Sequence, residues 1–506
     1  MLKEISRIIP LSMIDFFLLK ILKNPVLTLN ILKVISPDLL EDTSKRKALY
    51  QAKRTIKKVK LYKNFLIANK IEPGDLSLND LKTLPYTSKE YYISKAKDIS
   101  ELLIEGDIKN ANIIYKSSGY TGKPFIWANN LKEEESDIDY ARLGLENLFQ
   151  ASKKNTLFIN GFALGSWVSG MKFAYIMRSI GPTINTGANI QEILEIIKIM
   201  GNKFDQIVIG GYPPFVKNLL EGGIKNGINF KKYNINFLLA GEGFPESCRD
   251  YMYNLIGSSP QNSRSRIYSI YGAADIGVSG INENEDTVNI RRMAEKNKKL
   301  AKRLFGEINT LPMLFHYNSM NFFIESTDKK EVVMSKINRH SLQPLIKYNI
   351  HDLGGVISNK EMRKILKEEG IKLKIKLALP FFFVNGRSDG TISINAAKVY
   401  PDTVMKAMYN NHYLANITTG RFRLRKEYNK NNDTIFIVDI ELKKYINPSI
   451  RVKRLFEKEI KTELIKSDIE YQDMINHYSD KALPHVNLLK LGELNSERTI
   501  KNVYLE

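Results

Sequence analysis

The residues best suited to chemistry lie in five short stretches, of which the first runs from Lys116 to Pro124 (KSSGYTGKP). It combines hydroxyl side chains, two glycines and a lysine. Backbone amides of such a loop can turn toward phosphate oxygens. It is not a Walker A motif, because only two residues separate the glycines and proline follows the lysine. These residues alone leave two interpretations open, a phosphate-binding loop or an ordinary glycine turn.

The other four stretches follow along the chain as Ala240–Pro245 (AGEGFP), Tyr268–Asp275 (YSIYGAAD), Leu345–Gly354 (LIKYNIHDLG) and Gly386–Gly390 (GRSDG). Each also has a plain structural interpretation. Asp352 precedes Leu-Gly-Gly and is placed to form an Asx turn. Tyr271 lies in an apolar run typical of a core. Taken singly, none of these stretches specifies a function.

In this order the stretches resemble the motifs of adenylate-forming enzymes, the superfamily of acyl-CoA and aryl-CoA synthetases and adenylation domains. The first resembles (S/T)SG(S/T)TGxP, Tyr268–Asp275 resembles YGxTE, Leu345–Gly354 resembles (Y/I)RYxxxDxG, and Gly386–Gly390 resembles GRxDD. The phenylacetate-CoA ligase and CapK-like branch is the most similar. The resemblance extends from about Leu81 to the C-terminus, and it implies an AMP-forming acid ligase.

The resemblance implies a role for each matched residue. The phosphates of ATP would be held by Ser117, Ser118, Gly119, Thr121, Gly122 and Lys123. The adenine would lie against Gly241, Glu242, Tyr271 and Gly272, and the ribose diol would be bound by Asp352 with support from Arg387. Asp275 would bind Mg²⁺, Asp389 would be the hinge, and Lys501 would stabilise the charge that develops on the α-phosphate, with Lys490 as the alternative lysine.

Several positions depart from the family pattern. Asp275 stands where glutamate is usual; it is one methylene shorter but can reach Mg²⁺ directly or through a water. Ala273 and Ala274 replace hydroxyl residues. Ala396 stands where the family commonly has glycine, in the motif that serves transfer of the acyl group to CoA. This departure bears on the use of CoA more than on formation of the adenylate. A second interpretation is therefore a degenerate nucleotide-binding or scaffold protein without turnover. A third is a basic protein that associates with a membrane or with nucleic acid.

The acyl pocket is indicated only by glycine-plus-aromatic stretches. Trp167 lies in the stretch from Asn160 to Gly170, and Gly211 and Tyr212 lie in Gly210–Pro214. Pockets favour such apolar walls, and so does tight helix packing. The expected ligands are ATP and Mg²⁺ with a small carboxylic acid. The acceptor would be CoA, a carrier protein or an amine, in polysaccharide or secondary-metabolite synthesis by resemblance alone.

Composition narrows the remaining classes. The chain has 506 residues and a formal net charge of +21, but its lysines are spread over the whole length, so we expect no dedicated nucleic-acid site. Cys248 is the one cysteine, which excludes a disulfide framework, and the six histidines are scattered. We expect a cytoplasmic protein without a structural metal.

The stretch from Ile8 to Ile35 is the most apolar part of the chain. Prolines, lysines and Asp15 interrupt it, so no apolar run within it is long enough for a membrane span. It also lacks the pattern of a cleaved signal peptide. Two interpretations remain: helices packed on the main body, or an amphipathic segment that contacts a membrane surface peripherally.

These motifs need elements to position them. Between about Asn112 and Gly272, apolar β-type runs alternate with helical patterns such as Lys132–Phe149, which predicts an α/β architecture with a largely parallel sheet. Shorter strands are expected afterwards, including Pro344–Tyr348. We expect a large N-terminal adenylate-forming domain of layered sheets and helices with a small mobile C-terminal α+β lid. The predicted boundaries are 1–80 for an N-terminal helical segment, 81–386 for the adenylate-forming domain and 387–506 for the lid.

Overall fold

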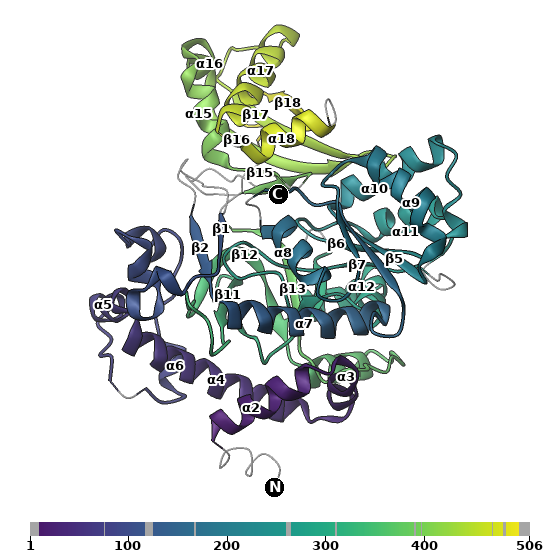
Figure 1. The fold of residues 1–506 in the computed structure, drawn as a ribbon. Helices are drawn as coiled ribbons and strands as arrows, with labels where there is room; N and C mark the ends of the chain where they lie inside the picture. Colours follow the sequence, from purple (N-terminus) through teal and green to yellow (C-terminus); the bar gives the residue numbers. More distant parts are fainter. Residues whose placement is uncertain are drawn as a thin grey trace.

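The computed structural model describes residues 10–74, 76–116, 125–165, 168–259, 265–308, 311–388, 391–395, 397–467, 469–478 and 482–494. We call residues 10–388 the body and residues 391–494 the C-terminal part. The C-terminal part sits at one end of the body (Figure 1). Parallel and antiparallel sheets combine with helices, so the predicted α/β class is confirmed.

A five-stranded parallel sheet forms one half of the body, with the strand order β4-β3-β5-β6-β7. Its strands are β3 (Thr156–Asn160), β4 (Thr183–Asn185), β5 (Gln206–Gly211), β6 (Ile235–Leu239) and β7 (Ile267–Ser269). The helices around it are α7 (Leu131–Phe149), α8 (Val168–Met177), α9 (Ile190–Met200), α10 (Pro213–Lys225) and α11 (Glu246–Leu255).

Alternate residues of this parallel sheet enter different cores. Ile159 and Ile209 pack in the cluster that holds α9, α10 and α11. Phe158 and Val208, one position earlier on the same strands, pack with side chains of α7 and α8. Both faces of the sheet are therefore covered, which explains why its strands are continuous apolar runs in the sequence.

A six-stranded antiparallel sheet forms the other half, with the order β10-β11-β12-β13-β9-β8. Its strands are β8 (Ile281–Asn282), β9 (Met313–Tyr317), β10 (Phe322–Ser326), β11 (Glu331–Lys336), β12 (Tyr348–Ile357) and β13 (Phe381–Arg387). Side chains of α12 (Glu285–Lys296), α13 (Lys298–Phe305) and α14 (Asn359–Glu368) pack with its strands β9, β12 and β13. A separate hairpin of β1 (Ile113–Lys116) and β2 (Ile126–Asn129) leads into and out of the glycine loop.

The expected strand at Pro344–Tyr348 is wrong, because β12 begins only at Tyr348. Lys347 has a φ of +46°, in the left-handed region that extended strands do not use. The Lys347 Nζ donates to the carbonyl oxygens of Leu81 and Lys82, at 3.3 and 2.8 Å. Leu345 and Ile346 are buried, but in a loop. Because buried loop residues and buried strand residues are both apolar, the sequence pattern resembled that of a strand.

The C-terminal part has a core of its own. It contains β14 (Ile392–Ile394), β15 (Ala397–Val399), β16 (Thr418–Tyr428), β17 (Thr434–Leu442), β18 (Pro484–Leu489), α15 (Pro401–Asn410), α16 (His412–Ile417), α17 (Ile450–Ser467) and α18 (Ile469–Tyr478). The strands β16, β17 and β18 form a sheet, and Phe422, Val438 and Phe456 are fully buried at its centre. This core shares no residue with those of the body.

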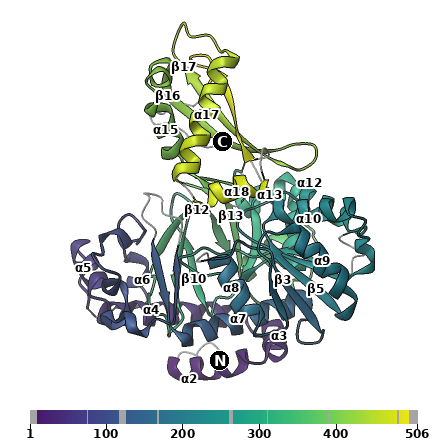
Figure 2. The same ribbon diagram turned by 45° about the horizontal axis from the view of Figure 1, so that its top comes forward.

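Helices at the start of the chain cover the far end and one side of the body (Figure 1). They are α2 (Leu11–Leu22), α3 (Pro25–Val34), α4 (Pro37–Lys58), α5 (Lys60–Ala68) and α6 (Asp80–Thr83). Leu22 and Leu32 pack with Tyr140 and Leu143 of α7. Figures 1 and 2 show α2 and α3 at the end opposite the C-terminal part. Within the described ranges, no helix is both long and apolar enough to cross a membrane.

Candidate active site

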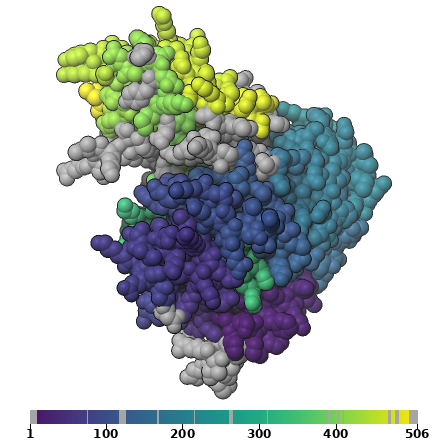
Figure 3. Space-filling model, turned by 60° about the vertical axis from the view of Figure 1, so that its left-hand side comes forward, coloured from purple at the N-terminus to yellow at the C-terminus, as the bar shows by residue number. Residues whose placement is uncertain are grey.

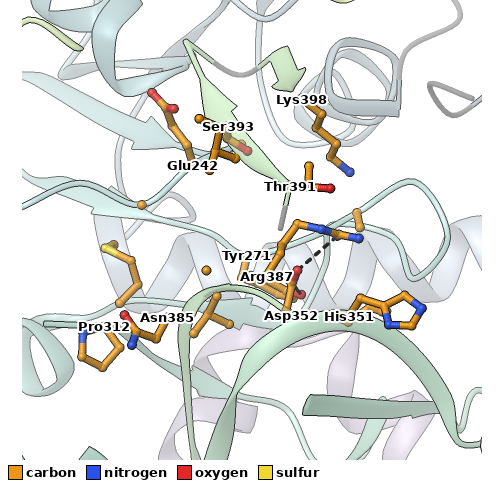
Figure 4. Close-up of a pocket in the computed structure, with 18 of the residues that line it drawn as sticks. Glu242, Tyr271, Pro312, His351, Asp352, Asn385, Arg387, Thr391, Ser393 and Lys398 are labelled. Carbon is orange, nitrogen blue, oxygen red and sulfur yellow. Dashed lines mark hydrogen bonds and ion pairs between the residues drawn. The ribbon is translucent and has the colours of Figure 1, made fainter. Parts of the chain in front are cut away.

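A cavity of about 850 Å³ lies where the C-terminal part meets the body. From the body, it is lined by the loop after β6, the segment after β7, and residues of β12 and β13. The C-terminal part adds residues of the β14–β15 hairpin and of β16. Figure 4 shows Thr391, Ser393 and Lys398 on one side and Asp352, Arg387 and His351 on the other. The volume is in the range of small-molecule sites.

Asp352 projects into this cavity from an irregular part of β12. The pairing of β12 with β13 shifts register between Asp352 and Gly354, and His351 has a φ of +62°. Such a bulge re-aims side chains that a regular strand would place elsewhere. Arg387 on β13 pairs with Asp352 across the sheet, and its Nη1 donates to the Asp352 Oδ1 at 3.2 Å.

Tyr271 holds the other carboxylate oxygen of Asp352. Its hydroxyl donates to the Asp352 Oδ2 at 2.5 Å. Its ring packs edge-on against Phe382, with 4.9 Å between centroids. Burial, followed by the charge of Asp352, raises the pKa of Tyr271 well above its usual value. The phenol therefore stays protonated and keeps Asp352 in one orientation.

Gly272 is required by the backbone around it. A Cβ at this position would lie 2.6 Å from the carbonyl oxygen of Gly277 and 2.8 Å from the Cα of Val278. Ala273 and Gly277 exchange backbone hydrogen bonds of 3.1 and 2.8 Å and close this turn. The turn delivers Asp275 to the cavity, so the glycine has a structural reason besides close approach of an adenine.

Asp275 is almost fully buried and has one oxygen available. Its Oδ2 accepts from the Tyr348 hydroxyl at 2.8 Å and lies 3.3 Å from the Lys89 Nζ. Its Oδ1 is buried and has no hydrogen-bond partner among the described residues. Burial favours a higher pKa, but Lys89, Lys398 and the bond from Tyr348 outweigh it and hold the pKa of Asp275 below its usual value. A buried, ionised carboxylate with an unused oxygen fits a bound Mg²⁺.

That fit rests on a single carboxylate. Within the described ranges, no group of three or more His, Cys, Asp or Glu side chains is arranged to hold a metal ion. A magnesium ion bound by one or two carboxylates takes its remaining ligands from water and substrate phosphates. Asp275 is therefore compatible with a nucleotide-bound magnesium rather than with a metal held by the protein alone.

Glu242 lies in the loop after β6, which is fixed from two directions. On the body side, the Arg291 Nη2 donates to the carbonyl oxygen of Phe244 at 2.8 Å. From the C-terminal part, the Lys426 Nζ contacts the Glu242 Oε2 at 2.7 Å. Burial would lower the pKa of Lys426, but the charge of Glu242 raises it, so the amine stays protonated. The loop is thus a contact between the two parts as well as a cavity wall.

The rim beside Asp352 carries a second polar network. The His351 Nε2 lies 3.0 Å from the Glu90 Oε2, and its hydrogen bond lowers the pKa of Glu90 to about 2. The Ser388 backbone N–H donates to the carbonyl oxygen of His351 at 2.7 Å, and its hydroxyl donates to Glu331 at 2.5 Å. The chain is therefore fastened to β12 immediately before the predicted hinge at Asp389.

Comparison with known proteins identifies relatives of this architecture by structure alone. No protein-family model and no curated protein matches the chain. A 2-hydroxyisobutyryl-CoA ligase, solved with 2-HIB-AMP and CoA in the thioesterification state, gives a TM-score of 0.65 at 11% identity, covering 94% of this chain and 90% of that chain. The chain shares the fold of this ligase. The same ligase in the postadenylation state, with R3-HIB-AMP, gives 0.53 at 12% identity over 94% of this chain and 90% of that one.

The cavity brings together all of the predicted nucleotide-binding residues that the structure describes: Gly241, Glu242, Tyr271, Gly272, Asp275, Asp352 and Arg387. Gly211 and Tyr212 do not line it. Tyr212 packs edge-on against Phe162 at 5.1 Å, and its hydroxyl lies 3.1 Å from that of Ser169. Lys490 follows β18 and is also outside the lining.

Other predicted residues lie outside the described ranges, and their roles stay predictions. They are Ser117, Ser118, Gly119, Thr121, Gly122, Lys123, Trp167, Asp389, Ala396 and Lys501. The base of the β1–β2 hairpin is described, however. The ring of Phe125 lies 6.0 Å from the Lys89 Nζ, which in turn contacts Asp275.

Sequence reasoning missed three lysines that line the cavity, Lys89, Lys398 and Lys426. Lys398 follows the stretch Gly386–Gly390 by eight residues, so its position near a motif was a usable signal. Lys89 and Lys426 belong to no motif. Folding brings them to the cavity from segments distant in the sequence.

Proposed function

We propose that this protein is an ATP-dependent enzyme that activates a carboxylic acid as an acyl-adenylate and transfers the acyl group to a thiol or an amine. The observation that carries this proposal is the trio of Tyr271, Asp352 and Arg387, which faces a cavity between two parts of an acyl-CoA ligase fold. A carboxylate held by a phenol and a guanidinium can accept hydrogen bonds from a ribose diol.

Charge along the cavity supports the same reaction. Asp352 would fix the ribose, and Asp275 would hold the magnesium ion that neutralises the phosphates. Lys89 and Lys398 stand beside Asp275 and would oppose the negative charge that builds up when a carboxylate attacks the α-phosphate. Phe125, at the base of the glycine loop, lies near Lys89 at the Asp275 end of the cavity. Ser117 to Lys123 would bind the phosphates there. We expect Lys501 to add its charge during adenylation.

The placement of the C-terminal part supports a second half-reaction. The higher TM-score belongs to the ligase in its thioesterification state, 0.65 against 0.53 for the postadenylation state. We propose that the C-terminal part turns about Asp389 between the two half-reactions, so that one cavity serves both. Ser388 stays bonded to His351 and would define the fixed side of that hinge.

The motif resemblance supports the phenylacetate-CoA ligase and CapK-like branch and, through it, a place in polysaccharide or secondary-metabolite synthesis. A reaction that consumes ATP belongs in a compartment that supplies it, which favours a cytoplasmic protein. CoA, a carrier protein and an amine remain the candidate acceptors, because Ala396 departs from the common glycine.

ATP–pyrophosphate exchange across a panel of aryl, acyl and amino acids tests the proposal. We expect at least one acid to support exchange, and Asp352→Asn to lower kcat/KM for ATP by about a hundredfold, since a hydrogen bond to a charged group contributes about 1.5–3 kcal/mol and two ribose hydroxyls are involved. Asp328→Asn, an exposed carboxylate in the turn between β10 and β11, is the matched control and should leave exchange unchanged. ATP binding without exchange for any acid would favour the scaffold alternative.

A further inference from the structure

The helices α2 and α3 expose large apolar side chains at the surface of the body. Met13, Phe16 and Phe17 on α2 are 49%, 54% and 54% exposed, and Leu27 and Val34 on α3 are 47% and 83% exposed. The exposed positions of α2 recur at helical spacing, while Asp15 and Leu22 on its other side are buried. Apolar groups gathered in this way mark an interaction surface more often than scattered ones do.

Positive charge accompanies this apolar surface. Lys20 and Lys23 extend from the end of α2, and Lys33 from the end of α3; all three are exposed. Asp15 is the one acidic residue between Pro10 and Ile35, and it is buried in an ion pair with Lys47 at 3.0 Å. The helices α2 and α3 themselves therefore present apolar groups and lysines without a solvent-exposed carboxylate. We name Met13, Phe16, Phe17, Leu27 and Val34, with Lys20, Lys23 and Lys33, the α2–α3 face.

We propose that the α2–α3 face binds the surface of an anionic lipid bilayer. Helices that lie flat in a bilayer interface bury aromatic and aliphatic side chains to a depth of about 5–10 Å and direct lysines to anionic headgroups. The Lys20 Nζ lies 4.4 Å from the ring centroid of Phe16, so its stem already runs along the apolar group that would be immersed. Charge complementarity selects an anionic membrane over a neutral one.

The size of the face argues against a second copy of the chain as its occupant. At about 1.5 Å per residue α2 is about 18 Å long, and two neighbouring helices cover on the order of 400 Å². A stable protein interface buries about 800 Å² on each partner. Two copies would also bring six lysines together at their contact, which is unfavourable.

The position of the face leaves the cavity unobstructed. In Figures 1 and 3 the N-terminal helices, in purple, lie at the end of the body opposite the C-terminal part. A protein docked through α2 and α3 would keep the cavity and the C-terminal part away from the headgroups. Membrane binding through this face would set where the protein is located, whichever reaction the cavity performs.

Vesicle co-sedimentation of the full-length protein tests the proposal. We expect binding to phosphatidylcholine vesicles that contain about one third phosphatidylglycerol, and at least about tenfold weaker binding to phosphatidylcholine alone. Phe16→Ser/Phe17→Ser should weaken binding to the anionic vesicles by about tenfold or more. Lys20→Gln/Lys23→Gln should weaken it similarly at about 0.1 M salt and remove most of its salt dependence.

The chain offers a matched control. Tyr445 in the C-terminal part is 87% exposed, and the Lys444 Nζ lies 5.1 Å from its ring, as Lys20 does beside Phe16. Lys444→Gln/Tyr445→Ser removes the same groups elsewhere and should leave binding intact. Equal loss in this control would assign binding to the overall positive charge and overturn the proposal.

A direct probe avoids dependence on loss of function. Val34→Trp places an indole at the most exposed position of the face, and its emission should move to shorter wavelengths when anionic vesicles are added. Emission unchanged at saturating vesicles would contradict the proposal. Sedimentation equilibrium without lipid completes the test, because a dimer that Phe16→Ser/Phe17→Ser dissociates would make the face a contact between copies and overturn membrane binding.

Discussion

At the scale of single residues, the ring and the hydroxyl of Tyr271 have separate functions that a single substitution can distinguish. The ring packs on Phe382, and the oxygen holds the Asp352 carboxylate. If Asp352 binds a ribose, Tyr271 is a positioning residue for it. Losing the oxygen alone would leave the Asp352 Oδ2, in a partly buried side chain, with one partner fewer.

Tyr271→Phe should therefore raise KM for ATP by about tenfold to a hundredfold while changing kcat much less, since a hydrogen bond to a charged group contributes about 1.5–3 kcal/mol. ATP–pyrophosphate exchange measures both constants. Tyr268→Phe, on the preceding strand β7 and outside the cavity lining, is the control. A fall in kcat with unchanged KM would instead assign the hydroxyl to the chemical step.

How far the sequence predicted the site depends on whether a residue belongs to a local motif. Asp352, Arg387 and Tyr271 each lie in a local motif that the sequence makes recognisable, and the structure places all three in one cavity. Lys426 meets Glu242 across 184 positions of sequence, a distance at which no spacing rule applies. Lys426 follows other basic residues on β16, so its sequence context is typical of a solvent-exposed cation.

At the scale of elements, ion pairs join the C-terminal part to the body. Lys426 on β16 contacts Glu242, and Lys217 on α10 contacts Asp433 in the turn between β16 and β17, at 2.7 and 2.5 Å. Lys217 also lies 3.1 Å from Glu221 on its own helix. Both pairs must separate if the C-terminal part turns, so their strength biases its orientation.

Asp433→Asn keeps the shape of this turn and removes one charge of the second pair. If the present orientation serves acyl transfer, this variant should slow transfer to the acceptor about threefold to tenfold and leave pyrophosphate exchange unchanged or faster. Single-turnover transfer from preformed adenylate measures the first rate. Asp250→Asn, which neutralises one of the carboxylate partners of Arg292 within the body, is the control. Equal slowing of both half-reactions would contradict an orienting role.

Element prediction failed where long-range contacts override local pattern. The apolar side chains at 344–348 predict a strand, but Lys347 adopts a left-handed backbone conformation. Its amine donates to the carbonyl oxygens of Leu81 and Lys82. The strands β3, β5 and β6 were predicted because burial on both faces leaves continuous apolar runs, whereas β4, whose residues are partly exposed, lacks such a run and was not predicted. The bulge that turns Asp352 into the cavity has no such signature, since it depends on pairing with β13.

At the scale of the whole molecule, one buried histidine links the stability of the body to pH. His316 lies on β9 and is 2% exposed, and its Nδ1 is 3.2 Å from the carbonyl oxygen of Pro380. Burial lowers its pKa to about 4, although the Pro380 and Leu379 carbonyls oppose the shift. The unfolded chain, with a pKa of about 6.5, binds the proton first. The free energy of unfolding therefore decreases as pH falls from about 6.5 toward 4.

His316→Phe should remove this part of the pH dependence. Between pH values of about 7.5 and 5, we expect the wild type to lose about 2 kcal/mol more of its free energy of unfolding than the variant does. Urea unfolding followed by tryptophan fluorescence measures the loss, since Trp127 and Trp167 both belong to the body. His485→Gln, at an exposed position of β18, should behave like the wild type. Parallel pH profiles of wild type and His316→Phe would contradict the assignment.

The separate cores have a consequence for how this protein can change over generations. Since the core of the C-terminal part shares no residue with those of the body, a substitution inside one can be compensated there without repacking the other. The partners Glu242 with Lys426 and Lys217 with Asp433 have no such freedom, because a charge reversal on one side needs its opposite on the other. The interiors are therefore free to drift independently, while these few contact positions between the two parts must be inherited together.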